Sequence, residues 1–128
     1  RGAFAVGRKM TVDELDPVDL IVCGSVACTV SGARLGKGGG FSDLEYALAA
    51  QLGKVELKTP IVTTIHPIQL LDSEIPLMPH DIPVDYIATP EEIIECQRSL
   101  PRPTGIYWDL LSDEKIAEVP VLQRVKGY

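Results

Sequence analysis

An almost continuous apolar run occupies residues 19–27, with the sequence DLIVCGSVA. A run without polar alternation is typical of a strand that is buried on both faces, as in a parallel sheet. Two shorter runs rich in β-branched residues follow at residues 61–65 and 84–88, and each lies between prolines. The pattern therefore predicts three central strands, at residues 20–26, 61–65 and 84–88, and a weaker strand at residues 4–6.

The clearest helix lies between the first two central strands. Its apolar residues recur on one face at helical spacing, at Phe41, Leu44, Leu48 and Leu52. Ser42 and Glu45 match the capping-box pattern at its start, and Gly53 is a typical helix stop. A strand, a helix and a second strand in this order predict a right-handed parallel crossover.

Two shorter helices are predicted nearer the C-terminus. One begins at Pro90, because proline suits a first helical turn and the acidic residues after it favour the helix dipole. The other begins at Ser112 and ends before Pro120. Together the elements predict a parallel α/β fold, and the length of 128 residues fits a single domain.

Parallel sheets are usually covered by helices on both faces. The predicted helices are too few to cover both faces of this sheet. We therefore expect either a second copy of the chain, in a homo-oligomer, or a segment outside these residues to cover one side. The sequence begins at Arg1 without a methionine. We expect it to be processed or to be part of a longer protein.

The charge balance narrows the range of partners. Lys and Arg number 12 against 18 Asp and Glu, which gives a net charge of -6. Nucleic acids and anionic membranes attract proteins through a positive field, so we expect neither as a partner, whereas a small anionic ligand needs only a local positive patch. Apolar runs are far shorter than the roughly 20 residues of a membrane span. Three cysteines without a framework spacing predict reduced thiols in a cytoplasmic protein.

The most informative segment is residues 32–43, GARLGKGGGFSD, which follows the first strand and leads into the helix. Its glycines allow the backbone to turn successive amides around an anion, and a helix start adds partial positive charge. Arg34 and Lys37 add full charges, and Asp43 is placed to hold Mg²⁺ against phosphate oxygens. The segment therefore predicts a phosphate-binding loop. The alternative is an ordinary surface loop, with Asp43 merely stabilising a first helical turn.

This loop is neither of the two common phosphate-binding motifs. No Gly-Lys-Ser/Thr sequence closes it, so it is not a Walker A loop. Phe41 occupies the place of the third glycine in the dinucleotide-binding pattern G-x-G-x-x-G.

The segment does resemble the signature of 5-formyltetrahydrofolate cyclo-ligase, also called methenyltetrahydrofolate synthetase: Gly-x-Arg-Leu-Gly-x-Gly-x-Gly, an aromatic residue, one further residue and Asp. The resemblance continues downstream through Gln69, Ile75-Pro76, His80-Asp81-Ile82-Pro83-Val84-Asp85 and Thr89-Pro90. It is strongest to a divergent branch, the methenyltetrahydrofolate synthetase domain-containing proteins, in residues 32–46 and in the tail at residues 103–108 and 116–122. The chain resembles the C-terminal portion of the family's domain.

The resemblance implies a three-layer α/β/α sandwich with a mainly parallel sheet. It also implies ATP- and Mg²⁺-dependent conversion of 5-formyltetrahydrofolate to 5,10-methenyltetrahydrofolate, with a folate and a nucleotide as small-molecule partners. Arg34 and Lys37 are the implied catalytic residues, and Asp43 is the implied metal ligand. The residues implied to hold the nucleotide are Gly36, Lys37, Gly38, Gly39, Gly40 and Phe41.

The chain departs from the family in two respects. The enzymes usually read Tyr-Tyr-Asp-Arg where this chain reads Phe41-Ser42-Asp43-Leu44. The family's N-terminal part, with a basic helix that helps to bind ATP, has no counterpart in these residues. Two hypotheses follow: an ATP-dependent folate cyclo-ligase, or a non-catalytic or differently specific relative that binds a nucleotide or folate. We expect the isolated chain to be a poor catalyst in either case.

The remaining candidate residues have more ordinary interpretations. His80 and Asp81 are neighbours that could serve acid–base chemistry, but bracing of a loop is the favoured interpretation. Gln69 either lines a ligand cleft or belongs to a crossover turn. Cys23, Cys28 and Cys96 lack zinc-site spacing and are predicted to be buried thiols. Tyr107 and Trp108 are predicted to anchor the proline-rich tail.

Overall fold

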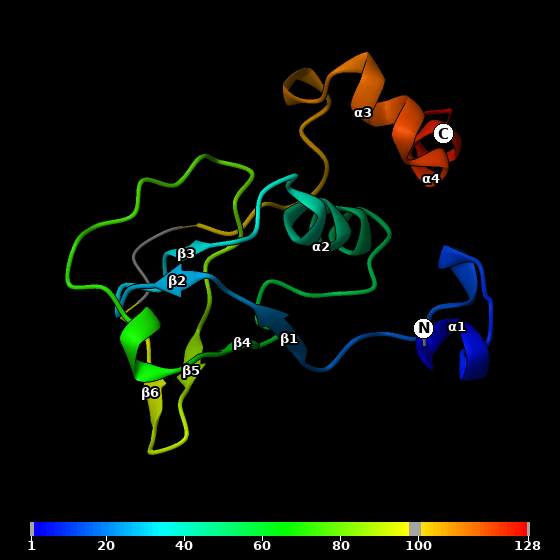
Figure 1. Ribbon diagram of the computed structural model, residues 1–128. Coiled ribbons are helices and arrows are strands. Elements are labelled where there is room, and N and C mark those ends of the chain that lie inside the picture. Colours follow the sequence, from blue (N-terminus) through cyan, green and yellow to red (C-terminus); the bar gives the residue numbers. More distant parts are fainter. Residues whose placement is uncertain (1, 98–100, 128) are drawn as a thin grey trace.

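The computed structural model describes residues 2–97 and 101–127. Its centre is a four-stranded sheet in the order β1–β4–β5–β6 (Figure 1). The strands are β1 (Ile21–Gly24), β4 (Ile61–Thr64), β5 (Tyr86–Ala88) and β6 (Ile93–Glu95). The first three run parallel, and β6 pairs antiparallel with β5. The predicted α/β fold with a mainly parallel sheet is confirmed, including the parallel pairing of the first two central strands.

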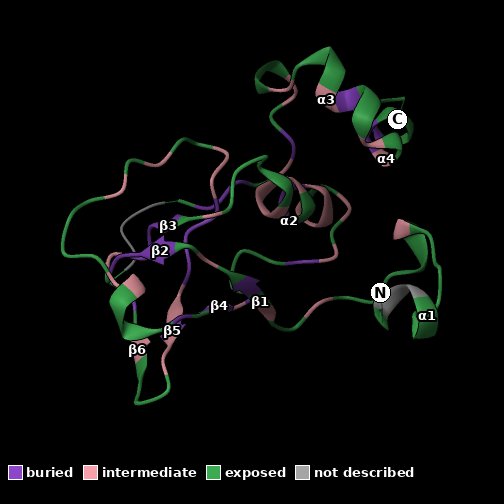
Figure 2. Cartoon of the chain, in the orientation of Figure 1, coloured by how far each residue is buried: buried purple, intermediate pink, exposed green. Residues whose placement is uncertain are grey.

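The strand register gives the sheet two unlike faces. Thr63 lies between Cys23 and Ile87 in register, and all three side chains are buried. On the opposite face, Val22 is 62% exposed and Ile93 is 73% exposed. The prediction that the first strand is buried on both faces was therefore wrong. Figure 2 shows how buried and exposed residues alternate along the chain.

Helix α2 (Phe41–Gln51) lies against the buried face of the sheet. Tyr46 and Ala49 join the core cluster of the strands, while Ala47 and Leu48 turn away from it toward the C-terminal tail. The tail forms η3 (Trp108–Leu110), α3 (Asp113–Glu118) and α4 (Pro120–Lys126). The layers thus follow the order sheet, α2, then the tail helices (Figure 1).

The apolar run at residues 19–27 is divided between two strands, and the second begins just after the predicted strand at residues 20–26. β1 ends at Gly24, and β2 (Ala27–Cys28) then pairs antiparallel with β3 (Arg34–Leu35) in a separate small sheet. The amide of Val26 donates to the carbonyl of Leu35 over 2.7 Å, which starts this hairpin. The hairpin returns the chain from the end of β1 to Arg34, so that Arg34 lies next to Gly24.

Two predicted elements were wrong in type. Residues 90–95 form a turn and then β6 rather than a helix, because the Thr89 hydroxyl accepts hydrogen bonds from the amides of Glu91 and Glu92. The β-branched residues after that turn pair with β5 at the sheet edge. The residues predicted as a weak N-terminal strand lie in a short helix, α1 (Gly2–Val6). The run at residues 4–6 was too short to distinguish the two states.

The ends of α2 explain one correct and one wrong prediction. Gly53 follows the helix with φ of 65°, the left-handed conformation of a typical C-terminal stop. At the other end the N-cap is Gly40, and Ser42 lies inside the first turn, so the predicted capping box is wrong. Ser112 does cap α3, since its hydroxyl accepts from the amide of Lys115. The short 3-10 turns η1 (Val12–Glu14) and η2 (Pro67–Gln69) complete the described elements.

Candidate functional site

A cavity of about 620 Å³ lies at the carboxyl ends of the parallel strands β1 and β4. Gly24, Ser25 and Thr64 line it from these strand ends. The glycine loop that leads into α2 forms a second wall, and residues 75–81 contribute a third. Ligands of open α/β sheets usually bind in this position, because strand ends and helix starts converge there. We call this space the phosphate cavity.

The glycine loop has a backbone that only glycine adopts easily. Gly38, Gly39 and Gly40 have φ angles of 95°, 79° and 63°. Among the described residues, the amides of these three glycines donate none of the backbone hydrogen bonds. Unpaired amides in such a loop, at the start of a helix, are available to an anion. The structure thus brings Gly36, Gly38, Gly40 and Phe41 of the predicted loop to the cavity, whereas Gly39 is not part of its lining.

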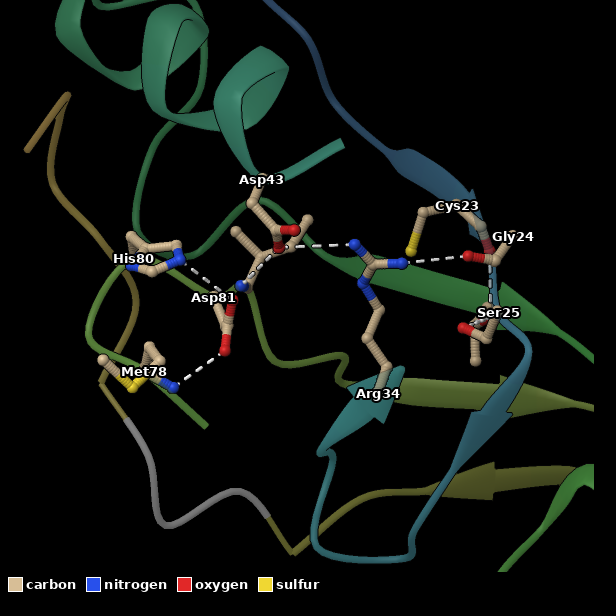
Figure 3. A network of polar contacts seen from close by, with 10 residues as sticks. Cys23, Gly24, Ser25, Arg34, Asp43, Met78, His80 and Asp81 are labelled. Atoms are coloured by element: carbon tan, nitrogen blue, oxygen red, sulfur yellow. Dashed lines mark hydrogen bonds and ion pairs between the residues drawn. The ribbon is translucent and has the colours of Figure 1, made fainter. Parts of the chain in front are cut away.

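Arg34 is almost completely buried at the back of this cavity. Its Nη1 donates to the Gly24 carbonyl over 3.0 Å, and its Nη2 donates to Oδ1 of Asp43 over 3.3 Å (Figure 3). The Arg34 side chain is only 3% exposed. The same Oδ1 also accepts a hydrogen bond from the amide of Ile82. Arg34 therefore connects the end of β1 to the start of α2, and Asp43 shares its charge.

Lys37 and Phe41 lie on the open side of the loop. Lys37 is exposed, and within the described part of the chain it makes no hydrogen bond or ion pair. Its charge is therefore available to a ligand in the cavity. Phe41 is 47% exposed, and Nζ of Lys115 lies 3.5 Å from the centroid of its ring, which is a cation–π contact.

Asp43 and Asp81 both line the cavity, and only Asp43 was predicted to hold a metal. Asp81 accepts from the amide of Met78 through Oδ2 and lies 3.5 Å from Nε2 of His80 through Oδ1. Asp43 uses only Oδ1 in its hydrogen bonds within the described residues. No group of three or more metal-binding side chains occurs in the described residues. A Mg²⁺ ion here would therefore take one or two carboxylates and complete its shell with phosphate and water, as Mg²⁺ usually does.

Comparisons with known proteins agree with this geometry. Residues 6–90 match the 5-formyltetrahydrofolate cyclo-ligase family. The chain belongs to this family.

The relatives fall into two groups. The chain is 44% identical over 110 residues to the methenyltetrahydrofolate synthase domain-containing protein of Mus musculus. These aligned residues are 85% of this chain and 30% of the mouse protein. The same protein of Danio rerio is 39% identical over 116 residues, 90% of this chain and 30% of the relative. The 5-formyltetrahydrofolate cyclo-ligase of Mycolicibacterium smegmatis is 33% identical over 89 residues, 70% of this chain and 42% of that enzyme. The chain thus spans less than half the length of these curated relatives.

Asp85, in the family-like segment H-D-x-x-V-D, is hydrogen-bonded to other parts of the fold. Its Oδ2 accepts from the amide of Ile61 over 2.8 Å and from Nη2 of Arg102. The Arg102 side chain is 2% exposed, and its Nη1 donates to the Leu57 carbonyl. Asp85 therefore joins β4, the start of β5 and the tail. The signal that could have identified this role in the sequence is Arg102, a basic residue between two prolines of the tail.

The structure also gives the positions of Gln69, Trp108 and His80. Nε2 of Gln69 donates to the carbonyls of Ser25 and Val26, so this residue holds a turn and does not line the phosphate cavity. Trp108 packs in the cluster formed by α2 and the tail helices, as predicted for an anchor. His80 lines the cavity, and its Nδ1 is buried without a hydrogen-bond partner among the described residues.

The three cysteines are free and buried, as predicted. Burial raises the pKa of the Cys23 and Cys28 thiols, and it raises the pKa of the Cys96 thiol to about 11. These thiols are therefore protonated and unreactive at neutral pH. No helix in residues 2–97 and 101–127 is both long and apolar enough to cross a bilayer.

Proposed function

We propose that this member of the cyclo-ligase family binds Mg²⁺·ATP in the phosphate cavity and uses it to convert 5-formyltetrahydrofolate to 5,10-methenyltetrahydrofolate. The observation that carries the proposal is the pair of glycine amides at Gly38 and Gly40, which make no hydrogen bond among the described residues and line the cavity with the exposed Lys37 and two carboxylates. The name of the Mycolicibacterium relative and the family match support the reaction. The buried free thiols suit the cytoplasm, where we expect the protein to act.

Each group has a distinct role in this proposal. ATP phosphorylates the formyl oxygen, N10 of the folate attacks the formyl carbon, and phosphate leaves. The glycine amides and Lys37 hold the transferred phosphate and stabilise its developing charge. Asp43 and Asp81 hold the Mg²⁺ ion against the phosphates. Arg34 acts mainly through Asp43, because its guanidinium is already bonded to that carboxylate and to Gly24.

A second function is favoured by two specific positions. Ser42 lines the phosphate cavity where the enzymes of the family usually carry a second tyrosine, and Leu44 replaces their arginine. Loss of an aromatic wall and a cation weakens the hold on a folate and on phosphate. The second candidate is therefore a nucleotide- or folate-binding relative that is non-catalytic or acts on another substrate.

The first experiment measures binding of Mg²⁺·ATP by calorimetry to the chain and to Lys37→Ala. Lys37 is exposed, so the variant folds normally, and we expect about tenfold weaker binding from the loss of one charged contact. Lys58→Ala is the matched control, because Lys58 is an exposed lysine whose partner is Glu56, outside the phosphate cavity. Equal affinity of all three proteins would remove the loop from consideration.

The second experiment follows the absorbance of methenyltetrahydrofolate with 5-formyltetrahydrofolate, ATP and Mg²⁺. We expect slow turnover by the chain and faster turnover by Ser42→Tyr. Binding of Mg²⁺·ATP without turnover by either protein would favour the second candidate. Rapid turnover by the unmodified chain would show that Ser42 does not limit the reaction.

A further inference from the structure

A second cavity, of about 420 Å³, lies on the other side of the start of α2. Its volume is within the range of small-molecule sites, roughly 300–1,000 Å³. Its lining is mostly apolar and combines three residues of α2 with the tail. These apolar and aromatic residues are Leu44, Ala47, Ile106, Tyr107, Leu110 and Leu111. We call this space the tail pocket.

The tail pocket and the phosphate cavity share a wall. Gly40, Asp43 and His80 line both of them. One molecule can therefore place a charged group on the glycine loop and an uncharged group in the tail pocket. His80 is placed at this junction.

The wall formed by the tail lies outside the segment that matches the family. That segment ends at residue 90, whereas the tail wall runs from Ile106 to Lys115. Relatives of the domain-containing type align over 85–90% of the chain, and the Mycolicibacterium enzyme aligns over 70%. The pocket is therefore built partly by a segment that extends beyond the family match.

Lys115 connects this tail segment to the glycine loop. Its Nζ lies over the Phe41 ring and also 3.0 Å from Oε2 of Glu118. Among the described residues that line the tail pocket, Lys115 is the only lysine or arginine, and it is already paired. The tail pocket is therefore mostly apolar, and its described lining contains no unpaired cation.

We propose that the tail pocket binds the base of the nucleoside triphosphate whose phosphates occupy the glycine loop. The inference rests on the proposed function, which supplies the triphosphate. A nucleotide joins a flat, uncharged ring to phosphates in one molecule, as the shared wall requires. A folate fits less well, because the carboxylates of its glutamate find no unpaired cation in this pocket.

The test compares Mg²⁺·ATP with Mg²⁺·tripolyphosphate, which has the phosphates without the base. We expect the protein to bind ATP at least tenfold more tightly. The single tryptophan, Trp108, neighbours Tyr107 of the pocket, so its fluorescence should change with ATP and not with tripolyphosphate. These two measurements need no variant.

A double variant, Tyr107→Ala with Leu110→Ala, removes the outer wall. Tyr107 and Leu110 are 40% and 52% exposed, so folding tolerates their loss. We expect about tenfold weaker ATP binding and unchanged tripolyphosphate binding. Leu20→Ala is the matched control, since Leu20 is 53% exposed and lines neither cavity.

The outcomes separate the two proposals. If ATP and tripolyphosphate bind equally, the phosphate cavity stands and the base pocket is wrong. If the double variant weakens 5-formyltetrahydrofolate binding instead of ATP binding, the pocket belongs to the folate and the base assignment is overturned. If neither phosphate compound binds, the proposed function fails and the inference fails with it.

Discussion

Arg34 and Asp43 connect the two ends of the glycine loop, with Nη2 of the arginine 3.3 Å from Oδ1 of the aspartate. The residues between them include the three glycines with left-handed backbone and the exposed Lys37. The ion pair therefore fixes the ends of the loop while leaving its middle open to a ligand. Fixing a binding loop before the ligand arrives lowers the entropic cost of binding.

The first prediction follows from the burial of this pair. In Arg34→Ala, Asp43 loses its counter-charge and the Gly24 carbonyl loses a donor. We expect the free energy of unfolding to fall by about 3 kcal/mol, as for other buried pairs that lose one partner. Urea unfolding followed by circular dichroism measures this loss.

The control is the double variant Arg34→Ala with Asp43→Ala. It removes both charges, so it should recover part of the stability that the single variant loses. A role confined to binding phosphate predicts instead that Arg34→Ala unfolds at the same urea concentration as the unmodified chain. That result would contradict the bracing role.

The sequence predicted the central strands, α2 and the glycine loop because each has a local signal. The apolar runs of β1 and β4 and the glycines before Phe41 act over a few residues. The partnership of Arg34 with Asp43 has no such signal, because it depends on the hairpin of β2 and β3. A basic residue beside glycines is equally consistent with a residue that binds phosphate and with a buried residue that holds the loop in place.

The errors have a similar cause. The structure of residues 90–95 depends on the local hydrogen bonds between Thr89 and Glu92 and on the pairing of β6 with β5 at the sheet edge. The exposed face of β1, with Val22, was not evident because an apolar run does not specify how many faces are covered. Pairings across the fold therefore determined what the local pattern left open.

The second prediction distinguishes two glycines of the same motif. A Cβ atom at Gly32 would lie 2.5 Å from the backbone oxygen of Val84, and φ is +91°. Gly38 has a similar φ of +95°, but its Cβ would meet open space. We expect Gly32→Ala to lose about 3 kcal/mol or more of stability and Gly38→Ala to lose about 1 kcal/mol.

Ligand binding should separate the two variants further. Gly38→Ala should fold and bind Mg²⁺·ATP more weakly, because Gly38 lines the phosphate cavity. Gly127→Ala is the control, since its φ of -81° is ordinary and its Cβ would make only normal contacts. Thermal unfolding measures the stability of the three variants, and calorimetry measures their affinity for Mg²⁺·ATP. Equal stability of the Gly32 and Gly38 variants would contradict the prediction.

The third prediction concerns Asp85. In Asp85→Ala the buried guanidinium of Arg102 loses its carboxylate and the Ile61 amide loses its acceptor. We expect a loss of roughly 3–5 kcal/mol in stability. At a temperature where the variant is still folded, its affinity for Mg²⁺·ATP should be unchanged, because Asp85 does not line the phosphate cavity. A stable variant with weak ATP binding would instead place Asp85 in the ligand site.

The last prediction concerns pH and the thiol of Cys96. Burial raises the pKa of this thiol to about 11 in the folded protein, against 9.0 for an ordinary thiol. The folded state therefore keeps a proton that the unfolded state releases above about pH 9. Stability contributed by this thiol is complete below pH 9 and falls as the pH rises from about 9 to 11. The slope for a single group approaches about 1.4 kcal/mol per pH unit.

Urea unfolding at pH 7.5, 9, 10 and 10.5, with a reductant present, tests this expectation. Lysines and tyrosines also titrate in this range, so the informative quantity is the difference between the unmodified chain and Cys96→Ala. The variant lacks the thiol and should lose less stability with rising pH, while the small cavity left by its missing sulfur lowers its stability equally at every pH. The two curves should therefore converge above pH 9. Curves that stay parallel from pH 7.5 to 10.5 would mean that the thiol of Cys96 ionises equally easily in the folded and unfolded states.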